Sequence, residues 1–183
     1  LIENAEQSLY DLTTHGQIRS GPKRFENILS DTLSIAEKAY KKDSETVGMK
    51  TGLSDFDKKI GGLHNSDLII IAGRPSMGKT SLATNIAFNA AKHIQESGKK
   101  SSIAFFSLEM SSEQLATRIL SEQSRISSND IRRGNLSEND LDNLVSVSKD
   151  ILEIPLFIDD TPAVNIGTLS SRARRLKRKH GLG

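Results

Sequence analysis

The chain has 183 residues, no cysteine, and a formal net charge of +2 from 25 Lys and Arg against 23 Asp and Glu. This length is sufficient for one domain with a sizeable core, or for part of a larger domain with a linker. The lack of cysteine excludes disulfides, thiolate metal sites and cysteine nucleophiles, and it fits a reducing compartment. The near balance of charges gives no sign of nucleic acid or membrane binding through overall charge.

The apolar runs are too short to cross a membrane. The longest, Leu68–Ala72 and Ile103–Phe106, fall far below the roughly 20 residues that a membrane-spanning helix needs. The N-terminus lacks the pattern of a signal peptide. The four histidines are scattered without the spacing of metal ligands, so no protein-bound transition metal is expected. We therefore expect a soluble, cytoplasmic protein without membrane contact.

The first 50 residues are predicted to form two helices joined by polar segments. Apolar residues at spacings of three and four indicate a short helix over Leu1–Thr14, which ends near His15-Gly16. A linker follows, and a second, amphipathic helix is predicted over about Phe25–Tyr40 before a polar stretch at 41–50. The residues expected to face inward on the second helix are Ile28, Leu29, Thr32, Ala36 and Ala39.

From residue 51 onward, helices alternate with apolar strands. A short helix capped by Ser54 precedes Gly61-Gly62, and the continuous apolar run Asp67–Gly73 is typical of a strand buried on both faces. The elements predicted next are a helix at 79–96, a strand at 103–108, a helix at 112–124 started by Ser111 and Gln114, a helix from the Ser137 and Asp140 capping pair to 152, a strand at 156–158 and a helix at about 167–180. This alternation predicts an α/β fold with a mainly parallel sheet.

A phosphate-binding pattern lies between the first predicted strand and the helix after it: Gly73-Arg74-Pro75-Ser76-Met77-Gly78-Lys79-Thr80. Glycines at both ends of the loop let bare backbone N–H groups approach an anion, and the helix that follows aims its positive end at the same place. Lys79 supplies a mobile charge for the β and γ phosphates, and the hydroxyl of Thr80 is placed to ligate Mg²⁺. The loop therefore predicts binding of a nucleoside triphosphate with magnesium.

Acidic residues follow two of the predicted strands. Glu109 comes directly after the strand at 103–108, where open α/β sheets hold their ligands. It is either a group that orients or deprotonates the water attacking the γ-phosphate, or a solvated acid at a strand end. Asp159 and Asp160 follow the next strand; they either hold a metal or, as the sequence favours, serve the turn into Thr161-Pro162.

One dense basic cluster occupies the last predicted helix: Arg172, Arg174, Arg175, Lys177, Arg178 and Lys179. Such a cluster contacts a phosphate backbone or an acidic neighbour, or it forms a solvated helix face, and the last of these is favoured. With two Tyr, six Phe and no Trp, the chain has little material for stacking bases. Any binding of DNA is therefore expected to use contacts with the DNA backbone.

Several segments together resemble the ATPase domain of bacterial replicative DNA helicases of the DnaB type. They are Thr51–Asp57, Gly61–Leu63, Asp67–Thr80, Phe106–Met110, Ile158–Pro162 and Ala173–Gly181. The resemblance is collinear from about Leu1 to the end of the chain, and the four residues from Arg74 to Met77 are more specific than a generic phosphate loop. It implies a RecA-like fold, with residues 1–16 as a linker helix, 17–50 as a connection into the domain, and 51–183 as the N-terminal part of the ATPase domain.

The resemblance also implies roles for individual residues. Lys79 and Thr80 match the Walker A positions, with Lys79 also counted as catalytic, and Glu109 matches the catalytic glutamate. The residues implied to contact ATP are Gly73, Arg74, Pro75, Ser76, Met77, Gly78, Lys79, Thr80 and Ser81, with Thr80 holding Mg²⁺. The implied assembly is a homohexamer in which the linker helix packs against a neighbour and single-stranded DNA occupies the central channel. Primase, a helicase loader and the replication fork are the implied partners.

Parts of the family pattern are expected to lie outside these residues. They are the N-terminal domain, the Walker B strand, expected to begin near Leu182, the arginine finger and the DNA-binding loops. We therefore expect negligible ATP hydrolysis by residues 1–183 alone, because an arginine finger contributes about 10³ to 10⁵ in rate in related chemistry.

Two other interpretations remain open at this level. A recombinase-type, DNA-dependent ATPase of the RecA class would share the strand, loop and helix, although Arg74–Met77 and the helix at Leu1 favour the helicase. A nucleotide-binding interaction module without turnover would account for residues 1–183 taken alone. Nucleotide affinity without hydrolysis would favour that view of the segment.

Overall fold

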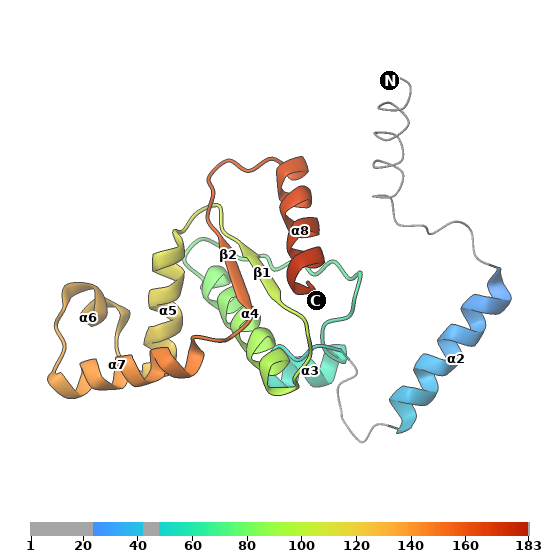
Figure 1. Cartoon of the computed structure of the whole chain (residues 1–183), viewed down its shortest axis with the longest axis horizontal. Coiled ribbons are helices and arrows are strands. Elements are labelled where there is room, and N and C mark those ends of the chain that lie inside the picture. The colour runs from blue at the N-terminus through green and yellow to red at the C-terminus, as the bar shows by residue number, and fades with distance from the viewer. Residues whose placement is uncertain (1–23, 42–47, 183) are drawn as a thin grey trace. The chain divides into compact units, whose positions relative to one another are not determined.

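The computed structural model describes residues 24–41 and 48–182 (Figure 1). The chain divides into two compact units, Leu1–Ser44 and Glu45–Gly183. The described part of the first unit is helix α2 (Phe25–Lys41), which confirms the amphipathic helix predicted there. Its apolar side chains Ile28 and Leu29 are exposed, so the predicted inward face is not covered by any described residue of that unit. The helix predicted at 1–14 lies outside the described residues.

In the second unit, helices alternate with two strands. Their order is α3 (Ser54–Ile60), α4 (Lys79–Glu96), β1 (Ile103–Phe106), α5 (Ser112–Ser124), α6 (Ser128–Arg133), α7 (Glu138–Ile151), β2 (Leu156–Asp159) and α8 (Ile166–His180). The predicted α/β class is confirmed, and α4 and α5 have the predicted bounds. The capping pairs predicted before α5 and α7 both form capping boxes. The short helix α6 was not predicted, because its six residues carry too little periodicity to be recognised.

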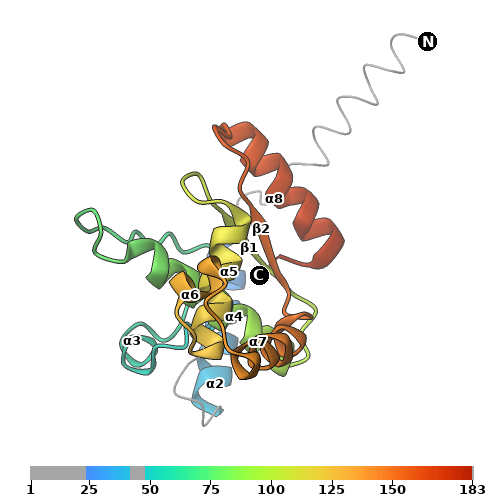
Figure 2. The same ribbon diagram turned by 90° about the vertical axis from the view of Figure 1, so that its left-hand side faces the viewer.

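The two strands pair in parallel and form the centre of a layered unit. Their register aligns Ile103 with Leu156 and Phe106 with Asp159. Figures 1 and 2 show α8 on one side of this pair and α4 with α5 on the other. Leu182 forms an isolated parallel bridge with Ser102, at the position where the sequence predicts that a further strand begins. A single backbone bridge thus lies beside the start of β1, outside the two-stranded sheet.

The predicted strand at Asp67–Gly73 is wrong for this structure. The segment forms no strand ladder, and Leu68 and Ile70 are 86% and 79% exposed. A strand of a parallel sheet exists only through hydrogen bonds to its neighbours, and among residues 24–41 and 48–182 nothing pairs with this run. The predicted strand at 103–108 is also shorter than expected and only half-buried, since β2 is the one strand that pairs with it in the described part of the chain.

Helix α4 carries most of the core of the second unit. Phe88, Ala91 and Ile94 on this helix are buried, as are Leu115 and Ile119 on α5. Their spacing of three and four residues places them on one face of each helix, where α4 packs against both α5 and the strands. The helix that follows the phosphate loop is therefore fixed by the best-packed part of the molecule.

A buried turn ties α3 to α4. Ser54 does not cap α3 as predicted, because the N-cap position is Leu53 and has no side-chain hydrogen bond. Instead Asp57, only 5% exposed, accepts hydrogen bonds from the backbone N–H of Thr51 at 2.9 Å and from its hydroxyl at 2.8 Å. Asn89 of α4 donates to the Thr51 carbonyl at 3.2 Å. Asp57 thus organises a turn that docks on α4.

No helix among residues 24–41 and 48–182 combines the length and apolarity needed to span a membrane.

Candidate functional site

The loop before α4 turns through two residues in the left-handed backbone region. Ser76 has φ 63° and Gly78 has φ 82°. Left-handed backbone suits Gly78 but costs energy at Ser76, and such strain is concentrated at ligand-binding loops. The turn brings the chain around the amino end of α4, where Lys79 begins the helix.

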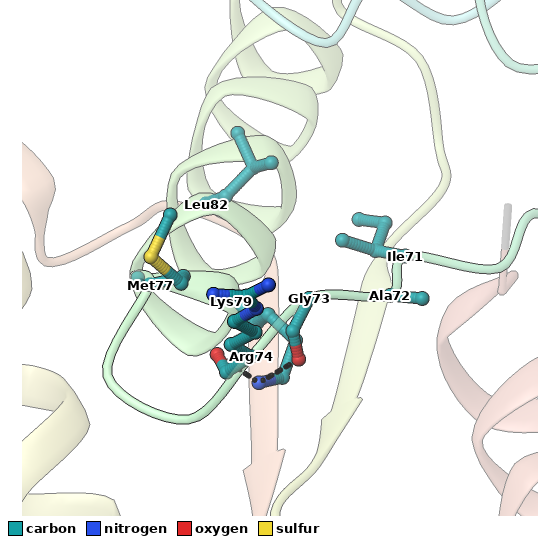
Figure 3. Close-up of a pocket in the computed structure, with 8 residues that line it drawn as sticks. Ile71, Ala72, Gly73, Arg74, Met77, Lys79 and Leu82 are labelled. Carbon is teal, nitrogen blue, oxygen red and sulfur yellow. Dashed lines mark hydrogen bonds between the residues drawn. The ribbon is translucent and has the colours of Figure 1, made fainter.

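Lys79 points back into the loop. Its Nζ atom donates hydrogen bonds to the carbonyl oxygens of Gly73 at 2.9 Å and Arg74 at 3.1 Å, drawn as dashed lines in Figure 3. The lysine is half-buried, and its ammonium group lies against the carbonyls at the start of the loop. The two carbonyl partners are neutral, so the positive charge remains available to an anion.

An open pocket of about 450 Å³ surrounds this lysine. Its lining includes Gly73, Arg74, Met77 and Lys79 from the loop and Leu82 from the first turns of α4 (Figure 3). The volume falls within the range of roughly 300–1,000 Å³ that small-molecule sites occupy. The lining combines cationic side chains, backbone groups and apolar side chains. This composition fits a ligand that has both phosphate groups and a less polar part.

Backbone donors in the loop are free to bind an anion. The N–H of Met77 donates to the Arg74 carbonyl at 3.3 Å, whereas those of Gly78, Lys79 and Thr80 have no backbone acceptor within the described part of the chain. The Thr80 hydroxyl likewise has no hydrogen-bond partner among those residues. Free N–H groups at a helix start, together with a lysine ammonium, form a cradle for phosphate oxygens, and the Thr80 hydroxyl is a suitable oxygen ligand for Mg²⁺.

Glu109 lies in the loop that joins β1 to α5. Figure 1 shows α4 running antiparallel to β1, so this loop and the phosphate loop lie at the same end of the layers. The Glu109 side chain is exposed. The turn around it is held by Ser107, whose hydroxyl donates to the Met110 carbonyl at 2.6 Å and accepts from the Met110 N–H at 3.1 Å. An exposed carboxylate on a fixed turn at this end is suited to meet a water molecule beside a bound triphosphate.

Comparison with known proteins identifies the family to which the chain belongs. The model of the DnaB-like helicase C terminal domain matches residues 48–183. The chain belongs to this family. Among curated relatives, the replicative DNA helicase DnaB of Rickettsia conorii (strain ATCC VR-613 / Malish 7) is 46% identical over 187 residues, covering 100% of this chain and 38% of the relative. The replicative DNA helicase DnaC of Bacillus subtilis (strain 168) is 35% identical over 186 residues, covering 100% of this chain and 39% of the relative.

A solved structure agrees on the fold. The structure of a DnaB-like replicative helicase and its interactions with primase superposes with a TM-score of 0.69 at 23% identity, covering 97% of this chain and 41% of that chain. The predicted RecA-like fold and the resemblance to DnaB-type helicases are therefore confirmed. The chain spans less than two fifths of the length of its Rickettsia relative.

Within this DnaB-like domain, Ser81 makes a contact that sequence spacing did not indicate. The guanidinium of Arg118 on α5 donates from Nη1 to the Ser81 hydroxyl at 2.9 Å. The residue next to Thr80, expected to contact ATP, is thus engaged by the neighbouring helix. Residues 37 positions apart carry no mutual signal in a single sequence. The bond links the first turn of α4 to the middle of α5.

The two aspartates after β2 have separate partners. Asp159 accepts from the N–H of Thr161 at 3.1 Å and from its hydroxyl at 2.7 Å, and it forms an ion pair with Arg172 at 2.6 Å. The Thr161 hydroxyl and then Arg172 lower the pKa of Asp159 from its ordinary value to about 2. The predicted role in the turn into Thr161 is confirmed for Asp159, whereas the carboxylate of Asp160 accepts a hydrogen bond from the N–H of Ser112 at 2.7 Å. Among the described residues, no group of His, Cys, Asp and Glu is arranged to hold a metal.

Because it pairs with Asp159, Arg172 differs from the rest of the basic cluster of α8. It is half-buried against the end of β2, while the other cations of the helix are exposed. These exposed members are Arg174, Arg175, Lys177, Arg178 and Lys179. The helix contains no acidic residue, so the charge on its outer face is uncompensated within the helix.

Proposed function

We propose that this chain is the ATP-binding segment of a hexameric replicative DNA helicase. In this proposal the intact protein couples ATP hydrolysis to translocation on single-stranded DNA and unwinds the duplex at the replication fork. The observation that carries it is the loop before α4, where free N–H groups and Lys79 converge, in a chain of the DnaB-like family. The proposed partners are primase and a helicase loader, and the proposed location is the cytoplasm.

The proposed binding step exchanges the partners of Lys79. Its Nζ leaves the carbonyls of Gly73 and Arg74 and moves to the β and γ phosphates, while the N–H groups of Gly78 and Thr80 donate to phosphate oxygens. Mg²⁺, when bound with the nucleotide, would neutralise phosphate charge, and the Thr80 hydroxyl is the ligand that this chain offers. Arg74 and Met77 line the pocket beside the loop and would contact the rest of the nucleotide.

For hydrolysis, we propose that Glu109 orients and deprotonates the attacking water. Its exposure leaves the carboxylate free to accept a hydrogen bond, and the Ser107–Met110 turn limits where it can point. General-base assistance of this kind contributes typically 10²- to 10⁴-fold in rate.

The test is strand displacement from a forked duplex by the intact protein with ATP and Mg²⁺. We expect Lys79→Ala to abolish displacement and ATP turnover, whereas Lys92→Ala, which removes an exposed cation elsewhere on α4, leaves both unchanged. DNA-stimulated ATP turnover without displacement would favour a recombinase-type ATPase instead. Displacement that survives Lys79→Ala would refute the proposal.

A further inference from the structure

The loop that carries Glu109 is tied to the end of β2 on both sides. At its start, the N–H of Ser107 donates to the backbone carbonyl of Asp159 at 2.9 Å, at the last aligned pair of the two strands, Phe106 with Asp159. At its end, the N–H of Ser112 donates to Oδ2 of Asp160 at 2.7 Å. Only four residues lie between these two attachments. The path of the loop is therefore set by the last residue of β2 and the residue that follows it.

The second attachment is made by a side chain and so depends on residue type. Ser112 is the first residue of α5, and its N–H is one of those that an α-helix leaves unpaired at its start. Ser111 serves the N–H of Gln114, so Asp160 supplies an acceptor that the cap does not. A carboxylate is also favoured at the positive end of a helix, and hydrogen bonding to Ser112 lowers the pKa of Asp160.

The body of α5 is fixed independently of Asp160. Leu115 is fully buried against the core, and Arg118 bonds Ser81 at the start of α4. Loss of the Asp160 contact would thus loosen the junction between the Glu109 loop and the first turn of α5, which only the Ser111–Gln114 capping box and the Ser107–Met110 turn would then hold, while the rest of the helix stays in place. Glu109 lies directly before this junction, so its position would become less well fixed.

We propose that Asp160 is a positioning residue for ATP hydrolysis, which holds the Glu109 loop through the N–H of Ser112. This inference rests on the proposed function, because it takes Glu109 to be the base. Asp160 acts through Ser112, first through its backbone N–H and to a smaller extent through its side chain. Its loss is expected to affect the chemical step and to leave nucleotide binding at the phosphate loop unchanged.

Two variants of the intact protein remove the same hydrogen bond from opposite sides. Asp160→Ala removes the acceptor. Ser112→Pro removes the donor at the first position of a helix, where proline is well tolerated, and the extended backbone of Ser111 (φ −71°, ψ 159°) suits a residue before proline. We expect each to lower kcat about tenfold with KM for ATP unchanged within about twofold, since misplacement by about 1 Å costs up to about 10²-fold.

Matched controls separate the bond from general damage. Ser112→Ala keeps the backbone N–H, and Asp160→Asn keeps an acceptor oxygen, so both are expected to retain kcat within about threefold. Asp142→Ala changes an exposed aspartate on α7 and is expected to behave as the wild type. The double variant Asp160→Ala, Ser112→Pro should be no slower than either single one, because both remove one bond.

The outcomes distinguish this inference from the proposed function. An unchanged kcat in both Asp160→Ala and Ser112→Pro, with Glu109→Gln inactive, overturns the positioning role but leaves Glu109 as the base. Equal losses of kcat and ATP affinity also overturn it, because they indicate disruption of the whole site. Full activity in Glu109→Gln would instead show that Glu109 is not the base. Both the proposed role of Glu109 and the positioning role of Asp160 would then be refuted.

Discussion

Replacement of Asp57 by alanine should destabilise the second unit without changing the pocket beside Lys79. The side chain is 5% exposed and accepts from both the backbone N–H and the hydroxyl of Thr51, itself fully buried. Asp57→Ala would leave these two buried donors without a hydrogen-bond acceptor, because a methyl group cannot accept one. The turn would also lose its hold on α4, which it makes through Asn89.

The expected cost follows from the two donors left unpaired. A buried donor without an acceptor costs about 1–3 kcal/mol, and the Thr51 hydroxyl can recover part of this by rotating toward another acceptor. We therefore expect Asp57→Ala to lower the free energy of unfolding by about 2–4 kcal/mol, the larger part coming from the backbone N–H, which cannot turn away. Asp57→Asn retains one acceptor oxygen and should lose less.

Urea unfolding of the intact protein, followed by circular dichroism, measures this difference. Asp55→Ala is the matched control, because it removes an exposed aspartate from the first turn of the same helix α3. The control should lie within about 0.5 kcal/mol of the wild type. If Asp57→Ala also lies within about 0.5 kcal/mol, the reasoning from buried donors is refuted for this turn.

Three further outcomes are expected. Gly52→Ala should lower the free energy of unfolding by more than Gly134→Ala. Both glycines have positive φ, but only the Cβ added at Gly52 would overlap another side chain, that of Asn89, so equal effects in urea unfolding would argue against the close approach. Gly78→Ala should weaken nucleotide binding, measured by calorimetry, through backbone strain alone, about 1–2 kcal/mol, since no atom lies within 4 Å of the added Cβ. Because the folded pKa of Asp159 is about 2, below its unfolded value, its stabilising contribution is present above about pH 4 and lost as pH falls toward 2. Unfolding measured between pH 5 and 2 should show a smaller loss in Arg172→Ala, and an identical pH profile would contradict the role of the ion pair.

Local signals accounted for most of the fold. The bounds of α4 and α5 and the capping boxes of α5 and α7 were predicted because their causes lie within a few residues of each other. The run Asp67–Gly73 was predicted as a strand from its apolar composition alone. Strand formation requires a hydrogen-bonding neighbour, and composition does not report whether one is present.

The candidate site shows the same division between local and distant causes. The loop from Gly73 to Thr80 could be predicted because every group that defines it is contiguous. The bonds of Arg118 to Ser81 and of Asp160 to Ser112 could not, since they join residues 37 and 48 positions apart. Glu109 was found from its place after a strand, and its catalytic role remains a prediction.

The tether of Lys79 to its own loop has a consequence for selectivity. Any anion that enters must replace two hydrogen bonds that the ammonium group already makes, to the carbonyls of Gly73 and Arg74. A single small anion offers few oxygens in exchange, whereas a chain of phosphates reaches the ammonium group and the free N–H groups of the loop together. The loop is therefore expected to bind a polyphosphate more tightly than a small single anion.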